Sequence, residues 1–177
     1  DKDCYLEFIP DQIIPYKNSR YYQKILLNVD PSASLIYSEI IVPGRVAMGE
    51  LFSYDVCYLR TIGNDTKHTT KFIDNCILDP KNQKLNSLGI FGNHTVVASV
   101  YILAPKKFVN VLNQKINIML KNNAEIYGGS SILPNECGLL IRLLCNSSEI
   151  TKTEIYNIVR IVRKEILGVS FTEIRKT

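Results

Sequence analysis

Tryptophan is absent from the 177 residues, histidine occurs only twice, and no two cysteines form a C-x-x-C pair. Two histidines, His68 and His94, are too few for a three-histidine metal site. A phosphate-binding loop is missing too: the turn at residues 44–50 lacks a third glycine and a Lys-Ser/Thr pair, and it leads into a strand pattern instead of a helix. These absences argue against an enzyme.

Long apolar runs and dense positive charge are also missing. The longest uncharged apolar run, residues 95–105, is shorter than the roughly 18 residues of a membrane-spanning helix, so we expect no membrane span. Lysine and arginine exceed the acidic residues by 21 to 17, a formal net charge of +4. This excess is scattered, whereas a nucleic-acid groove needs a dense stripe of positive charge. We therefore expect no nucleic-acid partner.

The five cysteines are an odd number for a disulfide framework, which favours a reducing, cytoplasmic compartment. Cys57, Cys76 and Cys145 lie in apolar strand patterns, so we expect them to be small buried side chains. Cys137 lies beside a charged residue and a glycine, and we expect it to be the most exposed. Nothing nearby in the sequence is expected to lower the pKa of its thiol.

What the chain does contain is typical of one folded domain. Hydrophobic residues make up 46% and charged residues 21%, which excludes wholesale disorder. No repeat, low-complexity tract or linker divides the sequence, so we expect a single domain over residues 1–177.

The periodicity predicts a mainly β fold with two helices toward the C-terminus. Residues 52–58 alternate between apolar and polar side chains, as in a half-buried strand, and residues 95–103 are apolar on both faces, as in a strand covered on both sides. Gly63-Asn64-Asp65 is a hairpin-turn signal. The other predicted strands are residues 4–9, 25–29, 34–42, 68–78 and 138–144.

The two helices have the 3.6-residue period. Val109, Leu112 and Ile116 recur on one face of a helix predicted over Lys106–Lys121. In the last helix, Thr151-Lys152-Thr153-Glu154 has the form of a capping box, and Gly168 is placed to end the helix.

Four residues are candidates for chemistry or binding. His94 and Cys137 carry groups that bind metals, although for a lone histidine such as His94 a turn or capping role is favoured. Arg45 and Glu50 lie on the same turn after Pro43-Gly44. They are either a structural ion pair or, because arginine is enriched at interface hot spots, part of a partner-binding surface. Both interpretations stay open at this point.

Several motifs in series resemble those of the urease accessory protein UreD family, called UreH in some lineages. No single one is specific, but their order covers nearly the whole chain. They are Phe-Ile-Pro-Asp-Gln-Ile-Ile-Pro-Tyr at residues 8–16 with Arg20 and Gln23; residues 33–34 and 37–41; Pro-Gly-Arg at 43–45 with Gly-Glu-Leu-Phe at 49–52; Asp74 with Leu-Asp-Pro at 78–80; and the strand at 138–144.

The resemblance implies a nickel-urease maturation factor without catalytic activity. Proteins of this family bind apo-urease and the partner UreF, and with the GTPase UreG they deliver Ni²⁺ to the urease active site, with no tightly bound cofactor of their own. Their fold is a stacked-sheet, helical β scaffold with two helices near the C-terminus. The family's proteins are longer, so this chain resembles their latter two-thirds and is expected to lack the N-terminal part.

A protein that passes Ni²⁺ onward needs polar or acidic groups along a wet path, with ligands weak enough to release the ion. Positions that match family motifs and have suitable chemistry are candidates for the nickel path or for partner binding, with the two arginines placed to orient carboxylates or partners. These positions are Asp11, Gln12, Arg20, Glu39, Arg45, Glu50, Asp74 and Asp79.

Two other hypotheses stay open. One is a β-rich protein-binding module, or a remnant of a maturation factor that no longer delivers nickel. The other is a small hydrolase that uses Cys137 or His94.

Overall fold

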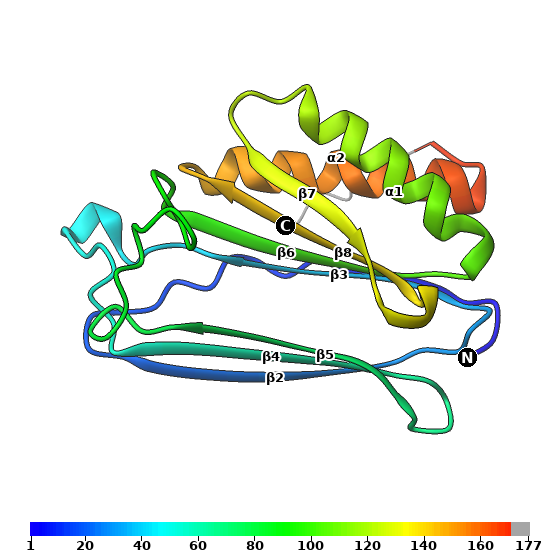
Figure 1. Cartoon of the computed structure of the whole chain (residues 1–177), viewed down its shortest axis with the longest axis horizontal. Helices are drawn as coiled ribbons and strands as arrows, with labels where there is room; N and C mark the ends of the chain where they lie inside the picture. The colour runs from blue at the N-terminus through cyan, green and yellow to red at the C-terminus, as the bar shows by residue number, and fades with distance from the viewer. Residues whose placement is uncertain (171–177) are drawn as a thin grey trace.

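A computed structural model describes residues 1–170, in which eight strands form two stacked sheets and two helices lie on the outer face of the larger sheet (Figure 1). This confirms the mainly β fold with stacked sheets. The five-stranded sheet has the order β1 (Tyr5–Phe8), β3 (Ser34–Ile41), β6 (Val96–Leu103), β8 (Gly138–Cys145) and β7 (Tyr127–Ile132). The three-stranded sheet has the order β2 (Arg20–Asn28), β4 (Val56–Asn64) and β5 (Thr70–Leu78). The helices are α1 (Lys106–Lys121) and α2 (Ser148–Leu167).

The first four strands coil from one sheet to the other. The chain passes from β1 in the larger sheet to β2 in the smaller one, returns to β3 beside β1, and crosses again to β4 beside β2. Both neighbouring pairs are parallel, with Tyr5 opposite Ser34 and Arg20 opposite Val56. This path is the helical β arrangement that the resemblance implies, and it brings side chains distant in sequence to face one another between the sheets.

The central strands of the larger sheet are buried on both faces. All eight residues of β3 and all eight of β6 are buried, which explains why their sequences are almost continuously apolar. Alternate residues point toward the helices, where they pack against the apolar stripe of α1 and that of α2 in one hydrophobic cluster. The predicted strand at 95–103 is therefore confirmed as a strand covered on both sides. Neither helix within residues 1–170 is long and apolar enough to cross a membrane.

The start of α2 differs from the capping-box prediction. Ser147 is the N-cap residue: its backbone is extended and its hydroxyl accepts a hydrogen bond from the Ile150 N–H at 3.3 Å. Thr151 lies inside the helix and donates to the Ser147 carbonyl at 2.7 Å. The Glu154 side chain is buried and accepts hydrogen bonds from two asparagine amides, so it is not available to cap a helix start at Thr151. Gly168 ends the helix with a left-handed conformation, as predicted.

The predictions around β4 and β5 were wrong in detail. Residues 52–55 form a bend instead of a strand, because the Ser53 carbonyl and the Asp55 N–H bond to the backbone of Asn18 and Ser19. Gly63 and Asn64 continue strand β4, and the turn lies at residues 65–69. There the Asp65 carboxylate accepts from two backbone N–H groups, at 2.9 Å each.

Two further strand predictions need correction, and one strand was missed. Strand β2 begins at Arg20, earlier than the predicted residue 25. His68 has a left-handed backbone and belongs to the turn, not to the strand that follows. Strand β7 was not predicted, because its Tyr-Gly-Gly-Ser-Ser-Ile sequence is almost fully exposed and lacks an alternating pattern. It forms the edge of the sheet by pairing with β8.

The N-cap assignment makes a testable prediction. Ser147→Ala removes the acceptor for the Ile150 N–H and is expected to lower the free energy of unfolding by about 1 kcal/mol. Thr153→Ala is the control: Thr153 is exposed, so this change is expected to cost less than about 0.5 kcal/mol. Chemical denaturation of both variants measures the difference. A larger loss for Thr153→Ala than for Ser147→Ala would contradict the assignment.

Candidate functional site

A layer of polar side chains crosses the space between the two sheets. On the larger sheet, Glu39 of β3 lies opposite Ser99 of β6, and Ser99 lies opposite Arg142 of β8, so the three form a row across the strands. Side chains of the smaller sheet meet this row from the other side. We call the set the inter-sheet polar layer; its members are Gln23, Tyr37, Glu39, Asp74, Ser99, Tyr101 and Arg142.

Glu39 connects the two sheets through Gln23. Its side chain is 2% exposed, and its Oε2 atom accepts hydrogen bonds from Gln23 Nε2 and from Tyr37 Oη, each at 3.1 Å. Gln23 lies on β2 in the smaller sheet and also donates to Tyr37 Oη at 3.1 Å. The buried Glu39 carboxylate therefore accepts one hydrogen bond from each of the two sheets.

Asp74 makes the second connection between the sheets. It lies on β5 of the smaller sheet, and its Oδ2 atom accepts from Tyr101 Oη at 2.6 Å and forms an ion pair with Arg142. Arg142 also donates to Ser99 Oγ. One guanidinium thus links Asp74 to the row that contains Glu39.

Apolar clusters lie on both sides of this layer. Along β3, Leu35 and Tyr37 belong to one inter-sheet cluster and Ile41 belongs to another, with Glu39 between them. On β6, Leu103 belongs to the first of these clusters and Val97 to the second, with Ser99 between them. The buried members Glu39 and Ser99 therefore interrupt a hydrophobic interior, whereas Asp74 and Arg142, with side chains 19% and 36% exposed, lie nearer its edge.

Burial dominates the electrostatics of the layer. It raises the pKa of Glu39, and the neighbouring Asp74 charge raises it further, while the Tyr37 hydrogen bond and the Arg142 charge act in the opposite direction. Burial and nearby carboxylates also raise the pKa values of Tyr37 and Tyr101, so both phenols stay protonated donors at neutral pH. The pKa of the Cys76 thiol, close to the layer, is raised mainly by burial.

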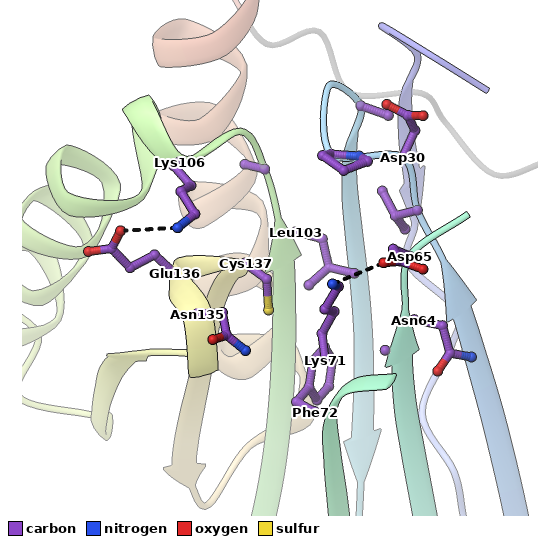
Figure 2. A pocket seen from close by; sticks show the side chains of 15 residues that line it. Asp30, Asn64, Asp65, Lys71, Phe72, Leu103, Lys106, Asn135, Glu136 and Cys137 are labelled. Atoms are coloured by element: carbon purple, nitrogen blue, oxygen red, sulfur yellow. Dashed lines mark ion pairs between the residues drawn. The ribbon is translucent and has the colours of Figure 1, made fainter. Parts of the chain in front are cut away.

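A pocket of about 380 Å³ opens between the ends of the two sheets (Figure 2). Its floor includes Phe72 and Leu103, and two ion pairs stand at its walls: Asp65 with Lys71 at 2.9 Å, and Lys106 with Glu136 at 3.8 Å. Cys137 also lines the pocket. The thiol is half-buried and its pKa is raised mainly by burial, so it lacks the depressed pKa of a catalytic nucleophile.

The sequence matches the family model for the UreD urease accessory protein over residues 1–176. The chain belongs to the UreD family. Similar relatives carry the same name. The chain is 35% identical to the urease accessory protein UreD of Cenarchaeum symbiosum over 99% of its own length and 61% of the relative's. It is 34% identical to UreD 2 of Brucella suis biovar 1 (97% and 57%) and 32% identical to UreD of Yersinia pseudotuberculosis (96% and 53%).

The chain thus spans between 53% and 61% of the length of these UreD relatives. The relatives are named as accessory proteins of urease and not as enzymes. Family membership therefore supports a role in urease maturation for this UreD-family chain.

Of the eight positions singled out from the UreD resemblance, the structure brings Glu39 and Asp74 into one network. Arg45 and Glu50 form a separate pair on their turn, joined by two hydrogen bonds of 2.9 and 2.5 Å. Glu50 also accepts from the Lys17 N–H, and the Arg45 guanidinium lies 4.3 Å from the centre of the Tyr16 ring. This geometry supports the structural ion-pair interpretation of Arg45 and Glu50.

The other four positions lie away from the inter-sheet polar layer. Asp11 is exposed and lies 3.8 Å from Lys152, and Gln12 is half-buried in the segment between β1 and β2. Arg20 is exposed and pairs with Asp55 at 3.3 Å. The Asp79 carboxylate accepts from the backbone and side chain of Asn82 at a turn.

The metal-ligand candidates outside the strands are isolated. His94 Nδ1 lies 3.2 Å from the Phe91 carbonyl oxygen, and its ring stacks on Tyr127, so it is a turn residue. Within residues 1–170, no three His, Cys, Asp or Glu side chains form a group that could hold a metal ion, so neither His94 nor Cys137 belongs to one. Cys57 and Cys145 are buried as expected, Cys76 is half-buried, and Cys4 is more exposed than Cys137.

Sequence analysis did not select five members of the layer. Gln23, Tyr37 and Arg142 lie within the motifs that carry the resemblance, but none of them was identified as a site residue. Ser99 and Tyr101 were treated as part of an apolar strand. The available signal was a polar residue inside a run that is otherwise apolar, such as Glu39 in β3 or Arg142 in β8.

The raised pKa of Glu39 predicts a pH dependence of stability. The folded state binds the Glu39 proton more tightly than the unfolded state, so this residue's contribution is most favourable at low pH and is lost as pH rises through the raised pKa. The free energy of unfolding of the wild type minus that of Glu39→Gln should therefore fall as pH rises from about 4. Denaturant titrations of both proteins across pH measure this difference, and a rising difference would contradict the assignment.

Proposed function

We propose that this protein is a non-catalytic urease accessory protein that binds apo-urease together with UreF-like and UreG-like partners and assists insertion of Ni²⁺ into the urease active site. Membership of the UreD family supports this role. The inter-sheet polar layer is the observation that carries the nickel part of the proposal. The five free thiols support action in a reducing compartment such as the cytoplasm.

In this proposal Ni²⁺ is cargo, and the polar layer offers it oxygen ligands in a row. Glu39 and Asp74 supply carboxylates and Ser99 supplies a hydroxyl oxygen, while the Gln23 amide nitrogen donates to Glu39. Without an ion, Arg142 compensates the negative charge of Asp74 and lies in the same row as Glu39, with Ser99 between them. An incoming divalent cation would neutralise the Asp74 carboxylate in place of Arg142, because its positive charge attracts the carboxylate at short range.

The ligand types favour transfer over storage. Imidazole and thiolate ligands bind Ni²⁺ more tightly than carboxylates and amides do, because Ni²⁺ is a borderline-soft ion. Since no three-residue metal group occurs within residues 1–170, a bound ion would have few strong ligands and would leave readily. This is the behaviour needed for a protein that hands a metal to an apo-enzyme.

The candidates outside the layer fit partner binding better than ion passage. Arg20 and Asp11 are exposed, and Arg45 is partly exposed on its turn. A partner could engage these side chains without rearrangement of the interior. We propose them, with Gln12, Glu50 and Asp79, as positions to test for contacts with apo-urease or the other accessory proteins.

The alternative is a β-rich binding module that has lost nickel delivery. The observation that favours it is that the candidates Asp11 and Arg20 are exposed away from the layer, where a partner can engage them without any nickel path. Complementation separates the two functions: expression of this chain in a strain that lacks its own accessory gene should restore urease activity if the chain acts in maturation. Binding to the partners without restored activity would favour the binding module.

The nickel path makes a prediction about carboxylate variants. In a reconstituted activation of apo-urease with the partner proteins, Glu39→Gln and Asp74→Asn should each reduce the nickel content and activity of urease at least tenfold. The reason is that each change removes a charged oxygen ligand from the layer. Glu125→Gln is the matched control, since Glu125 is exposed and lies outside the layer, and it should activate like the wild type.

Partner binding must be measured with the same proteins. The proposal expects the two layer variants to bind apo-urease and the accessory proteins as the wild type does, because both changed side chains face the space between the sheets. Normal urease activation by both variants would overturn the nickel path through the layer. Failure of the wild type to bind any of the partners would overturn the accessory function itself.

A further inference from the structure

No element within residues 1–170 covers the outer face of the smaller sheet, whereas the outer face of the larger sheet carries both helices (Figure 1). The strand register arranges its outward side chains in rows across β2, β4 and β5. One row is Tyr22, Tyr58 and Ile77. Tyr22 is 64% exposed and stacks on Tyr58 with ring centres 5.0 Å apart, and Ile77 is 51% exposed.

A second apolar row lies four residues away from the first, further along β2 and β4 and earlier in the antiparallel β5. It consists of Leu26, Ile62 and Ile73, and both Leu26 and Ile73 are at least half exposed. Two apolar rows on one sheet face form a larger patch than the scattered single hydrophobic residues of an ordinary protein surface. Such patches mark surfaces that bind other molecules.

A basic row separates the two apolar rows. It contains Lys24 and Arg60, with Asn75 completing it. Neither cation has a salt-bridge partner within residues 1–170. The nearest acidic position on β5, Asp74, points to the opposite face of the sheet and into the inter-sheet polar layer. The face is therefore apolar with an uncompensated positive centre.

This charge pattern disfavours a second copy of the chain as the occupant. A symmetric pair that buried this face would bring the basic rows of both copies together, and burying like charges at short range is costly. A partner with a carboxylate at the matching position would instead neutralise the row while its apolar side chains cover the two flanking rows.

The spacing of the rows matches an α-helix. Neighbouring rows are two residues apart along each strand, about 6.7 Å, so the apolar rows are about 13 Å apart. On a helix, positions i, i+4 and i+8 lie at about 0, 6 and 12 Å along the axis. An acidic residue at i+4 between apolar residues at i and i+8 would thus meet all three rows.

We propose that the outer face of the smaller sheet docks an amphipathic helix of a partner protein, with its carboxylate on Lys24 and Arg60 and its apolar side chains on the flanking rows. The inference rests on the proposed function, because it takes this partner to be one of the proteins with which the chain assembles in urease maturation. It adds the surface used and the chemistry of the segment bound there.

Charge reversal tests the docking surface. Lys24→Glu with Arg60→Glu should weaken the affinity for one partner, among apo-urease and the UreF-like and UreG-like proteins, at least tenfold. The control double variant, Lys84→Glu with Lys107→Glu, changes the net charge equally at exposed positions on other elements and should stay within twofold of the wild type. Lys24→Arg with Arg60→Lys keeps both charges and should also bind.

Several results would overturn the inference. Equal loss in the control variant would show general electrostatic attraction, and unchanged binding by the charge-reversed face would show that the partners dock elsewhere. In that second case the accessory function would stand and only the docking surface would fail. If the wild type bound none of the three partners, both the proposed function and the docking surface would fail.

Photocrosslinking identifies the occupant without a charge-reversed protein. With p-benzoylphenylalanine in place of Tyr58, the complex should crosslink to a partner helix that carries an acidic residue four positions from apolar residues on either side. Mass spectrometry of the crosslinked peptide gives its sequence. A crosslink to a second copy of the chain, or to a segment without that acidic residue, would contradict the proposal.

Discussion

The ion pair between Asp74 of one sheet and Arg142 of the other is the contact around which the interior is arranged. It crosses the space between the sheets and orients Arg142 toward Ser99 in the row that contains Glu39. The Glu39–Gln23 hydrogen bond makes a parallel connection. Together these contacts set which strand positions face one another between the sheets, because a shift by one residue would turn every side chain to the opposite face.

Stability alone does not explain such a layer. Glu39 is buried, and taking a carboxylate out of water costs free energy that its contacts repay only partly, whereas the Asp74 and Arg142 side chains keep 19% and 36% of their surface exposed. The two apolar clusters on either side show that this sandwich buries hydrophobic side chains where it can. The polar layer kept between them is the basis of the nickel path proposed above.

The local structure was predictable where the sequence carries strong local signals. Helix α1 has the predicted bounds, because its apolar stripe has a clear period and Pro105 stands at its start. Strand β7 was not predictable, since it depends on pairing with β8 and on the Asn117 side chain, which bonds the backbone N–H and C=O of Ser130. The start of α2 was misplaced because Ser147 and Thr151 are both capable caps, and only the fold decides between them.

The candidate site, too, was predictable from the sequence only in part. Glu39 and Asp74 were named from motifs, but their proximity depends on the register of four strands and on the stacking of two sheets, which no sequence spacing encodes. Crystals of the wild-type protein soaked in Ni²⁺ and measured at the nickel absorption edge test the central claim most directly. The account predicts an anomalous peak between the sheets, beside Glu39 and Asp74, that disappears in a Glu39→Gln, Asp74→Asn double variant. Peaks confined to surface groups such as His94, with a layer free of metal, would contradict it.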